Sequence, residues 1–175
     1  MRGETVGLRA LEPEDVSVLY RWENDPQVWR VSGTLAPFSR HALARFIEEQ
    51  QLDIYATRQQ RLVIETVAGG VAVGAVDLFD FDPLHGRAGV GILVYGPEDR
   101  GRGYAGEALD LLAEYAFGVL GLHQLYCNIL SDNAVSLALF EGRGFVRCGL
   151  KREWVRTGEG FADEYLLQRL RDPVR

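Results

Sequence analysis

A glycine-rich stretch between two apolar segments constrains the fold of this chain more than any other feature. The stretch EDRGRGYAG runs from Glu98 to Gly106, after the strand-like run GVGILVYGP and within the start of a helix-like run that continues as EALDLLAEYAF. Another strand-like run, HQLYCNIL, follows that helix. Two strands joined by a helix form a βαβ unit, whose strands we expect to be parallel and whose crossover we expect to be right-handed.

The segments on either side of this unit predict antiparallel pairing. Two β-rich runs meet at Gly69-Gly70, which predicts a hairpin, and a third strand follows the turn at Asp82-Pro83. At the other end of the chain, FVRCGLKREWVR and FADEYLLQRL are separated by TGEG and predict a β-hairpin. We therefore expect an α/β fold of the α+β type, with a mixed, mostly antiparallel sheet and a central βαβ unit.

The remaining segments predict a short first strand and three further helices. The strand is expected over 5–11, and the first helix is expected to end at Asp25-Pro26. Ser39 is the expected N-cap of the second helix, and Asp132 or Asn133 of the last one. No linker or repeat divides the sequence, so 1–175 is expected to form a single domain.

Composition excludes several classes of function. The formal net charge of −6 argues against a non-specific nucleic-acid binder, which normally carries a basic surface. No run approaches the roughly 18 apolar residues of a membrane helix, and no signal region is evident at the N-terminus, so we expect a cytoplasmic protein without a membrane partner. Cys127 and Cys148 lie in separate strand-like segments without C-x-x-C spacing, and no metal site is expected.

The glycine stretch itself allows two interpretations. Gly101, Gly103 and Gly106 fit the dinucleotide fingerprint G-x-G-x-x-G, with Asp132 as a ribose-binding acid, although the antiparallel surroundings disfavour that fold. Alternatively, backbone N–H groups from Arg100 to Ala105 hold another pyrophosphate at the positive end of the following helix. Arg100 and Arg102 add charge-assisted contacts in that case.

Three ordered blocks resemble the GNAT superfamily of N-acetyltransferases. Arg100 to Ala105 is similar to its R/Q-x-x-G-x-G/A acetyl-CoA loop, and NAVSLALFEGRGF, from Asn133 to Phe145, resembles its N-x-x-A/S-x-x-L-Y/F-x-x-x-G-F helix. The N-terminal run LRALEPEDVSVLYRWENDPQVWR resembles the subgroup of spermidine and ribosomal-protein N-terminal acetyltransferases. The resemblance covers about Leu8 to Leu170 and implies the GNAT fold.

The resemblance also implies a cofactor and its binding residues. Acetyl-CoA would be the cosubstrate, with the strand before the loop binding the pantetheine arm through its main chain. An amide of that strand, at Leu93 or Val94, would stabilise the oxyanion formed when an amine attacks the thioester, a contribution of about 3 kcal/mol. The residues expected to bind the cofactor are Ile92, Leu93, Val94, Arg100, Gly101, Arg102, Gly103, Tyr104, Ala105, Asn133, Ser136 and Phe140.

Two positions depart from the family pattern. Phe140 stands where the family commonly has the tyrosine that protonates the departing thiolate, and Gly89 stands where a carboxylate is often found. Asp77 and Tyr126 are candidate substitutes for catalysis, beside Asp80 and Glu65. These departures keep open an alternative from another class, a catalytically weak acyl-CoA-binding or sensing protein.

The acceptor is expected to be a primary amine, either a polyamine-like small molecule or a protein N-terminus. Trp22, Glu23 and Asp25 lie where related enzymes form an acceptor loop, and acidic and aromatic side chains suit a cationic amine. The family resemblance also leads us to expect a homodimer or larger homo-oligomer.

Overall fold

One seven-stranded sheet runs through the computed structural model, which describes residues 1–158 and 160–171. The strand order is β1-β2-β3-β4-β5-β7-β6. Neighbouring strands pair antiparallel except β4 and β5, which pair parallel. The strands are β1 (Val6–Ala10), β2 (Gln60–Thr66), β3 (Ala72–Asp82), β4 (Arg87–Val94), β5 (Gln124–Leu130), β6 (Val146–Thr157) and β7 (Gly160–Leu170).

Within the described residues, six α-helices connect and cover these strands. They are α1 (Val16–Glu23), α2 (Pro26–Ser32), α3 (Arg40–Glu49), α4 (Ile54–Thr57), α5 (Tyr104–Glu114) and α6 (Ala134–Glu141). The side chain of Ser39 accepts a hydrogen bond from Ala42 N at 3.0 Å, which confirms it as the N-cap of α3. Pro26 ends the first helix as expected, but it also occupies the first turn of α2, a helix that the sequence analysis did not anticipate.

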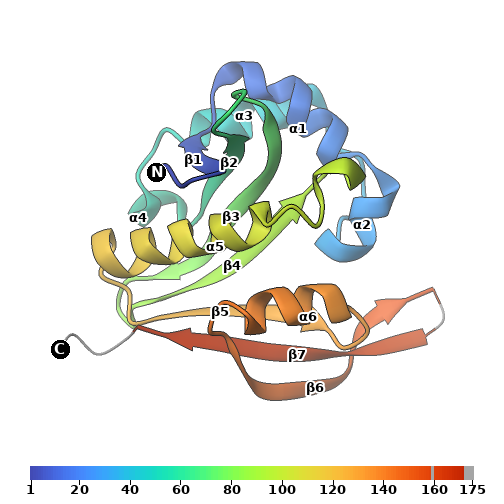
Figure 1. The fold of residues 1–175 in the computed structure, drawn as a ribbon. Coiled ribbons are helices and arrows are strands. Elements are labelled where there is room, and N and C mark those ends of the chain that lie inside the picture. The colour runs from blue at the N-terminus through green and yellow to red at the C-terminus, as the bar shows by residue number, and fades with distance from the viewer. Residues whose placement is uncertain (159, 172–175) are drawn as a thin grey trace.

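Two apolar clusters pack on opposite faces of the sheet because successive strand side chains alternate. Leu62 and Ile64 of β2 pack with α5 and α6 on one face, whereas Val63 packs with α1 and α3 on the other. Figure 1 shows α5 and α6 on the near side of the strands, with α1 and α3 at the upper end. Each helix therefore has a fixed position relative to the strands that it covers.

The βαβ unit is formed by β4, α5 and β5, and its two strands stay together over a short distance only. Their parallel register covers three residue pairs and ends at Gly89↔Tyr126. Beyond that pair the two strands diverge, which is visible in Figure 1 as the widening space between β4 and β5. The C-terminal hairpin of β6 and β7 continues the sheet on the β5 side.

This topology confirms the predicted mixed, mostly antiparallel sheet with a central βαβ unit and a terminal hairpin. It excludes the doubly wound dinucleotide fold, in which successive parallel strands extend from the first βαβ unit. Here β4 has the antiparallel β3 on its other side. The glycine stretch is therefore not a dinucleotide fingerprint of that fold.

Candidate active site

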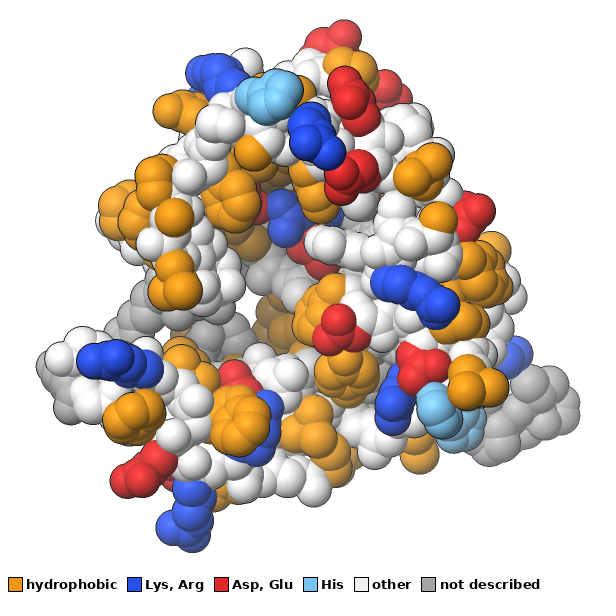
Figure 2. Space-filling view, turned by 180° about the vertical axis from the view of Figure 1, so that it is seen from behind, with side chains coloured by type: hydrophobic (Ala, Val, Ile, Leu, Met, Phe, Trp, Pro, Cys, Tyr) orange, Lys and Arg blue, Asp and Glu red, His pale blue; other side chains and the backbone are white. Residues whose placement is uncertain are grey.

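A cavity of about 400 Å³ lies where β4 and β5 diverge. Its wall combines residues of the two helical layers with both strands of the gap, so it reaches both faces of the sheet. Figure 2 shows the molecule deeply hollowed, with side chains of both charges on the inner wall. The described lining residues are Trp22, Glu23, Val28, Ser32, Gln59, Arg61, Ala75, Asp77, Phe79, Val90, Gly91, Ile92, Leu93, Cys127, Asn128, Ile129, Leu130, Asn133, Ser136, Phe140 and Glu164.

The backbone of β4 directs N–H groups toward this gap. Tyr95 N donates to Val73 O of β3 at 3.0 Å, and hydrogen-bonding direction alternates along an antiparallel strand. Since Leu93 lies opposite Ala75 in the same register, its N–H also faces β3. The N–H groups of Ile92 and Val94 therefore face the gap, which favours Val94 over Leu93 as a donor to a bound molecule.

The glycine loop follows β4 and ends at the N-terminus of α5. Gly101 and Gly103 have φ angles of 73° and 84°, in the left-handed region that favours glycine. Gly103 is the N-cap of α5, and no side chain among the described residues caps that helix. Its first amides are consequently available to an anion, as at other helix N-termini that bind phosphate.

The guanidinium of Arg100 binds the end of β4. Its Nε donates to Val94 O at 3.2 Å and its Nη2 donates to Tyr95 O at 3.1 Å. The predicted charge-assisted contact from Arg100 to a ligand therefore competes with a role in fixing the loop against the strand. Arg102, by contrast, is exposed.

Helix α6 supplies one wall of the cavity. Asn133 Oδ1 accepts a hydrogen bond from Ser136 N at 3.1 Å, so Asn133 is the N-cap, and the amide nitrogen of its side chain remains as a donor. Phe140 is buried and meets Phe145 edge to face, with ring centroids 5.0 Å apart. Burial raises the pKa of the neighbouring Cys127 thiol to about 12, which keeps it protonated at neutral pH.

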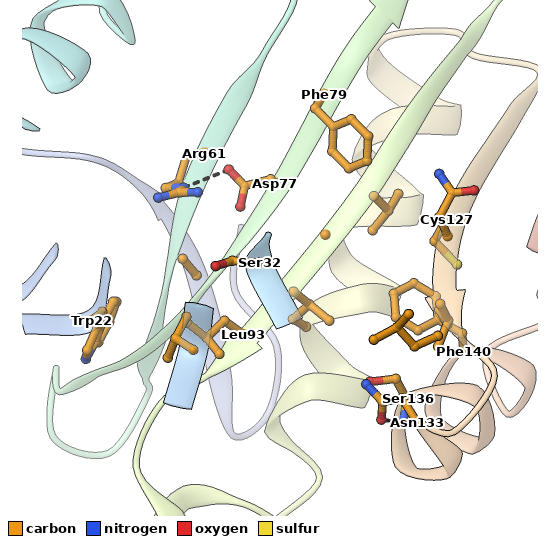
Figure 3. Close-up of a pocket in the computed structure, with 18 of the residues that line it drawn as sticks. Trp22, Ser32, Arg61, Asp77, Phe79, Leu93, Cys127, Asn133, Ser136 and Phe140 are labelled. Atoms are coloured by element: carbon orange, nitrogen blue, oxygen red, sulfur yellow. Dashed lines mark hydrogen bonds and ion pairs between the residues drawn. The ribbon is translucent and has the colours of Figure 1, made fainter. Parts of the chain in front are cut away.

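The opposite wall contains a charged triad that the sequence analysis only partly anticipated. Arg61 of β2 forms ion pairs with Glu23 of α1 and with Asp77 of β3, the latter at 2.7 Å between Nε and Oδ1. Burial opposes the charge on Arg61, but Asp77 and Glu23 outweigh it and raise the pKa further. Figure 3 shows Arg61 and Asp77 next to each other, on the same side as Trp22 and across the cavity from Phe140 and Asn133.

A second ion pair borders the cavity near the C-terminal hairpin. Lys151 forms a salt bridge with Glu164 and donates to Asn128 Oδ1 at 2.9 Å. Glu164 and Asn128 both line the cavity. The two residues are direct cross-strand partners, Lys151 on β6 and Glu164 on β7.

Several predicted site residues lie outside the described lining of the cavity: Asp25, Val94, Tyr126 and the loop residues 100–105. The hydroxyl of Tyr126 donates to Asp80 Oδ2 at 3.3 Å, and its ring meets Phe79, which does line the cavity, with centroids 6.2 Å apart. Burial and the charge of Asp80 raise the pKa of Tyr126. Asp25 accepts from Gln27 N at 2.8 Å and from the hydroxyl of Tyr95 at 3.0 Å, so it acts as the N-cap of α2.

Comparison with known proteins identifies the family. The family model described as an acetyltransferase (GNAT) domain matches residues 5–146. The chain belongs to the GNAT acetyltransferase family. The predicted family and an N-acetyltransferase activity are thereby confirmed, and the gap between β4 and β5 becomes the candidate site of acetyl transfer in a GNAT enzyme.

Individual relatives cover nearly all of this GNAT chain. The spermidine N(1)-acetyltransferase of Escherichia coli (strain K12) is 29% identical over 159 residues, which is 89% of this chain and 81% of the relative. An uncharacterized N-acetyltransferase p20 of Bacillus licheniformis is 28% identical over 172 residues, 96% of this chain and 94% of the relative.

Solved structures support the fold. The crystal structure of a spermidine N-acetyltransferase from Vibrio cholerae in complex with CoA and spermine superposes with a TM-score of 0.85 at 24% identity, covering 94% of this chain and 95% of that chain. The described residues contain no helix long and apolar enough to cross a membrane.

Proposed function

We propose that this protein transfers the acetyl group of acetyl-CoA to a primary amine by direct attack of the amine on the thioester. The observation that carries the proposal is the open edge of β4, whose outward-facing amides lead directly to the uncapped N-terminus of α5. A ligand with an extended amide-containing arm and a pyrophosphate would match this arrangement, with the arm along the β4 amides and the pyrophosphate at the N-terminus of α5. The whole chain, 1–175, is proposed to act as one domain.

The glycine loop is the proposed pyrophosphate site. Backbone amides between Gly101 and Ala105 would point at the phosphate oxygens, and the dipole of α5 would add its positive end. Nothing lies within 4 Å of a Cβ built at Gly101 or Gly103, so a ligand has room to approach the backbone there. Arg102 and the first helical residue, Tyr104, complete the proposed cradle.

The reacting end of the ligand is proposed to lie beside β4. The N–H of Val94 or Ile92, directed to the gap, would hydrogen-bond the thioester oxygen as it becomes an oxyanion, a contribution of about 3 kcal/mol. Across the gap, Asn133 and Ser136 would hold the pantetheine arm. Phe140 would pack against the thioester.

Proton transfer is proposed to rely mainly on water. Phe140 has no proton to donate to the departing thiolate, and Tyr126 is not among the described residues that line the cavity. Asp77 lines the cavity and is the remaining candidate to accept a proton from the amine, although its carboxylate also binds Arg61. A thiolate can leave without a strong acid, so this arrangement slows the reaction more than it prevents it.

The acceptor is proposed to enter from the side of α1, where Trp22 and Glu23 line the cavity. Cationic amines are attracted to carboxylates and to the faces of aromatic rings. The relatives that are spermidine acetyltransferases support an amine acceptor. A dodecameric structure of the Vibrio cholerae enzyme supports a homo-oligomer for this chain as well.

The second candidate function is an acyl-CoA-binding protein with weak turnover. Phe140 and Gly89 favour it because they remove the usual acid and carboxylate. Such a protein would bind acetyl-CoA through the same loop but would not acetylate amines at a useful rate. Binding alone therefore does not separate the two candidates.

The test is a measurement of CoA thiol release with a panel of primary amines, confirmed by the mass of the acetylated product. Amine-dependent release is expected, and Gly103→Ala is expected to lower kcat/KM for acetyl-CoA at least about tenfold. Gly121→Ala is the matched control, since Gly121 also has a positive φ of 67° and nothing within 4 Å of its built Cβ. Acetyl-CoA binding without transfer to any amine would favour the second candidate, and absence of both would reject the proposal.

A further inference from the structure

We infer that Arg61 is a specificity-determining residue, which binds a carbonyl or carboxylate oxygen of the carbon attached to the one that carries the acceptor amine. The acceptor is then an α-amino acyl group, from an amino acid or a peptide N-terminus, rather than a polyamine. The inference rests on the proposed function and deepens it. It depends on three features of the cavity: the free donors of Arg61, the balance of charge and the adjacency of the polar groups.

Arg61 retains a donor group that has no hydrogen-bond partner among the described residues. Its Nε and Nη1 bind Asp77 and Glu23, while no described residue accepts a hydrogen bond from Nη2. Among the described residues, Arg169 Nη1 is the buried side-chain nitrogen or oxygen that lacks a hydrogen-bond partner. Arg61 Nη2 also lacks a partner but does not belong to these buried atoms, so it is accessible to solvent. Because Arg61 lines the cavity and its side chain is only 18% exposed, a ligand oxygen in the cavity can meet this donor.

The charge balance does not suit a polycation. The described lining residues include three carboxylates, on Glu23, Asp77 and Glu164. Arg61 neutralises one of the first two, and Lys151 neutralises the third. Three negative charges and two positive ones leave a net charge of −1, which suits one ammonium group but not the several charges of a polyamine.

The adjacency of the polar groups suits an α-amino acyl group. Arg61 Nε donates to Asp77 Oδ1 at 2.7 Å, so the carboxylate lies directly beside the guanidinium that carries the unpaired Nη2. In an α-amino acyl group the nitrogen and the carbonyl oxygen are about 3 Å apart, from the standard bond lengths. Its amine can contact the carboxylate of Asp77 while its oxygen accepts from Arg61. A polyamine has no oxygen to satisfy the guanidinium, and its next charge would approach Arg61.

Arginine suits this role because its planar group offers several donors in a fixed geometry. Glu23 and Asp77 hold that plane from two sides, one from α1 and one from β3. Phe46 adds a third constraint, with the guanidinium carbon 5.2 Å from its ring centroid. The remaining donor is therefore preorganised rather than mobile.

The first experiment compares acceptors with the wild-type protein. Acetyl transfer is measured with alanine amide, free alanine, trialanine, spermidine and sec-butylamine, an amine of similar shape that lacks the oxygen. We expect kcat/KM for the best α-amino acyl compound to exceed that for spermidine and for sec-butylamine at least tenfold. The ranking of alanine against trialanine tells the free amino acid from the peptide. Equal or better turnover of spermidine would overturn the inference while leaving the proposed function intact.

The second experiment removes the guanidinium. Arg61→Met is expected to raise KM for alanine amide at least tenfold, to leave KM for acetyl-CoA unchanged and to improve the relative use of spermidine. Arg61→Lys, which keeps the charge but loses the planar fork, is expected to be intermediate. Arg9→Met is the matched control, since Arg9 bridges Asp15 and Glu65 outside the cavity, at 2.7 Å from each, and should not change selectivity. Unchanged selectivity in Arg61→Met would overturn the inference.

A further measurement applies if no amine is acetylated. That result would reject the proposed transfer reaction, but calorimetric binding of alanine amide and spermidine to the CoA-saturated protein still tests Arg61. Tighter binding of alanine amide, lost in Arg61→Met and retained in Arg9→Met, would support the role of Arg61 in recognition. Tighter binding of spermidine would overturn it.

Discussion

The ring of Phe79 covers Gly89 on the neighbouring strand so closely that a Cβ at Gly89 would lie 2.3 Å from the ring. The two residues are directly opposite in the register of β3 and β4. A side chain at position 89 therefore requires Phe79 to move. This contact leaves no room at position 89 for the carboxylate that the family resemblance led us to expect there, unless Phe79 moves.

The first prediction follows from that contact. Gly89→Ala is expected to destabilise the protein by about 1–3 kcal/mol, because the added methyl group overlaps the Phe79 ring. In a Phe79→Ala background the same change should cost much less, which gives a clear coupling energy. Urea unfolding of the four proteins measures it, and additive effects would show that the two residues do not collide.

The second prediction concerns the missing acid. Phe140 is buried beside Phe145 but lines the cavity, so a para-hydroxyl group in Phe140→Tyr would project toward the proposed thioester. We expect kcat to rise at least about tenfold, within the range of general acid catalysis. The variant should also lose activity as pH rises through about 10, the ordinary tyrosine pKa, because the hydroxyl must hold its proton. A pH profile of kcat identical to that of the wild type would contradict this account.

The third prediction concerns the carboxylate that ties α5 to the N-terminus of β1. Burial opposes ionisation of Glu107, but the hydroxyl of Thr5 and the amides of Glu4, Thr5 and Val6 donate to it and lower its pKa. The stability that ionised Glu107 contributes to the folded state is therefore complete above about pH 4.3, the ordinary glutamate pKa. It is lost as the pH falls through the lower pKa of Glu107 in the folded state. Compared with Glu107→Gln, the wild type should have the higher unfolding midpoint at pH 7. The difference should shrink below pH 4, and a constant difference would contradict the assignment.

The fourth prediction separates two roles of Asn133. Asn133→Ala and Ser39→Ala each remove an N-cap hydrogen bond, to Ser136 N and Ala42 N respectively, and each should cost about 1 kcal/mol of stability. Only Asn133 lies in the cavity, so only its variant should also raise KM for acetyl-CoA. Steady-state kinetics gives the KM for acetyl-CoA of both variants, and thermal unfolding gives their stability. An equal KM in both variants would leave Asn133 as a structural cap alone.

Local signals in the sequence predicted much of the fold. The caps at Ser39 and Asn133, the glycine turns and the alternating strands are determined by neighbours in the sequence, and each was found as expected. Helix α2 was missed because Pro26 carries two signals at once, the end of one helix and the first turn of the next.

The site was less predictable because it depends on contacts between distant segments. Arg61 carries no local signal, and its role appears only when the register of β2 and β3 brings it to Asp77 and α1 brings Glu23 to the same point. Tyr126 was predicted on the correct strand, but the sequence could not show that its hydroxyl would donate to Asp80 and that its side chain would not line the cavity. Whether the N–H of Leu93 or that of Val94 faces the gap likewise depends on which residues of β4 hydrogen-bond to β3.

The most direct test of the central claim is the thermal unfolding midpoint with saturating acetyl-CoA, CoA or NAD, each against buffer. At about 100 times the dissociation constant, a ligand of the native state contributes roughly 2.7 kcal/mol, which for a chain of this size is a rise of about 5–10 °C. We predict that rise with both CoA compounds, its loss or marked reduction in Gly103→Ala, and no rise with NAD. A midpoint unchanged by acetyl-CoA and CoA would contradict the account of the gap between β4 and β5 as a CoA site.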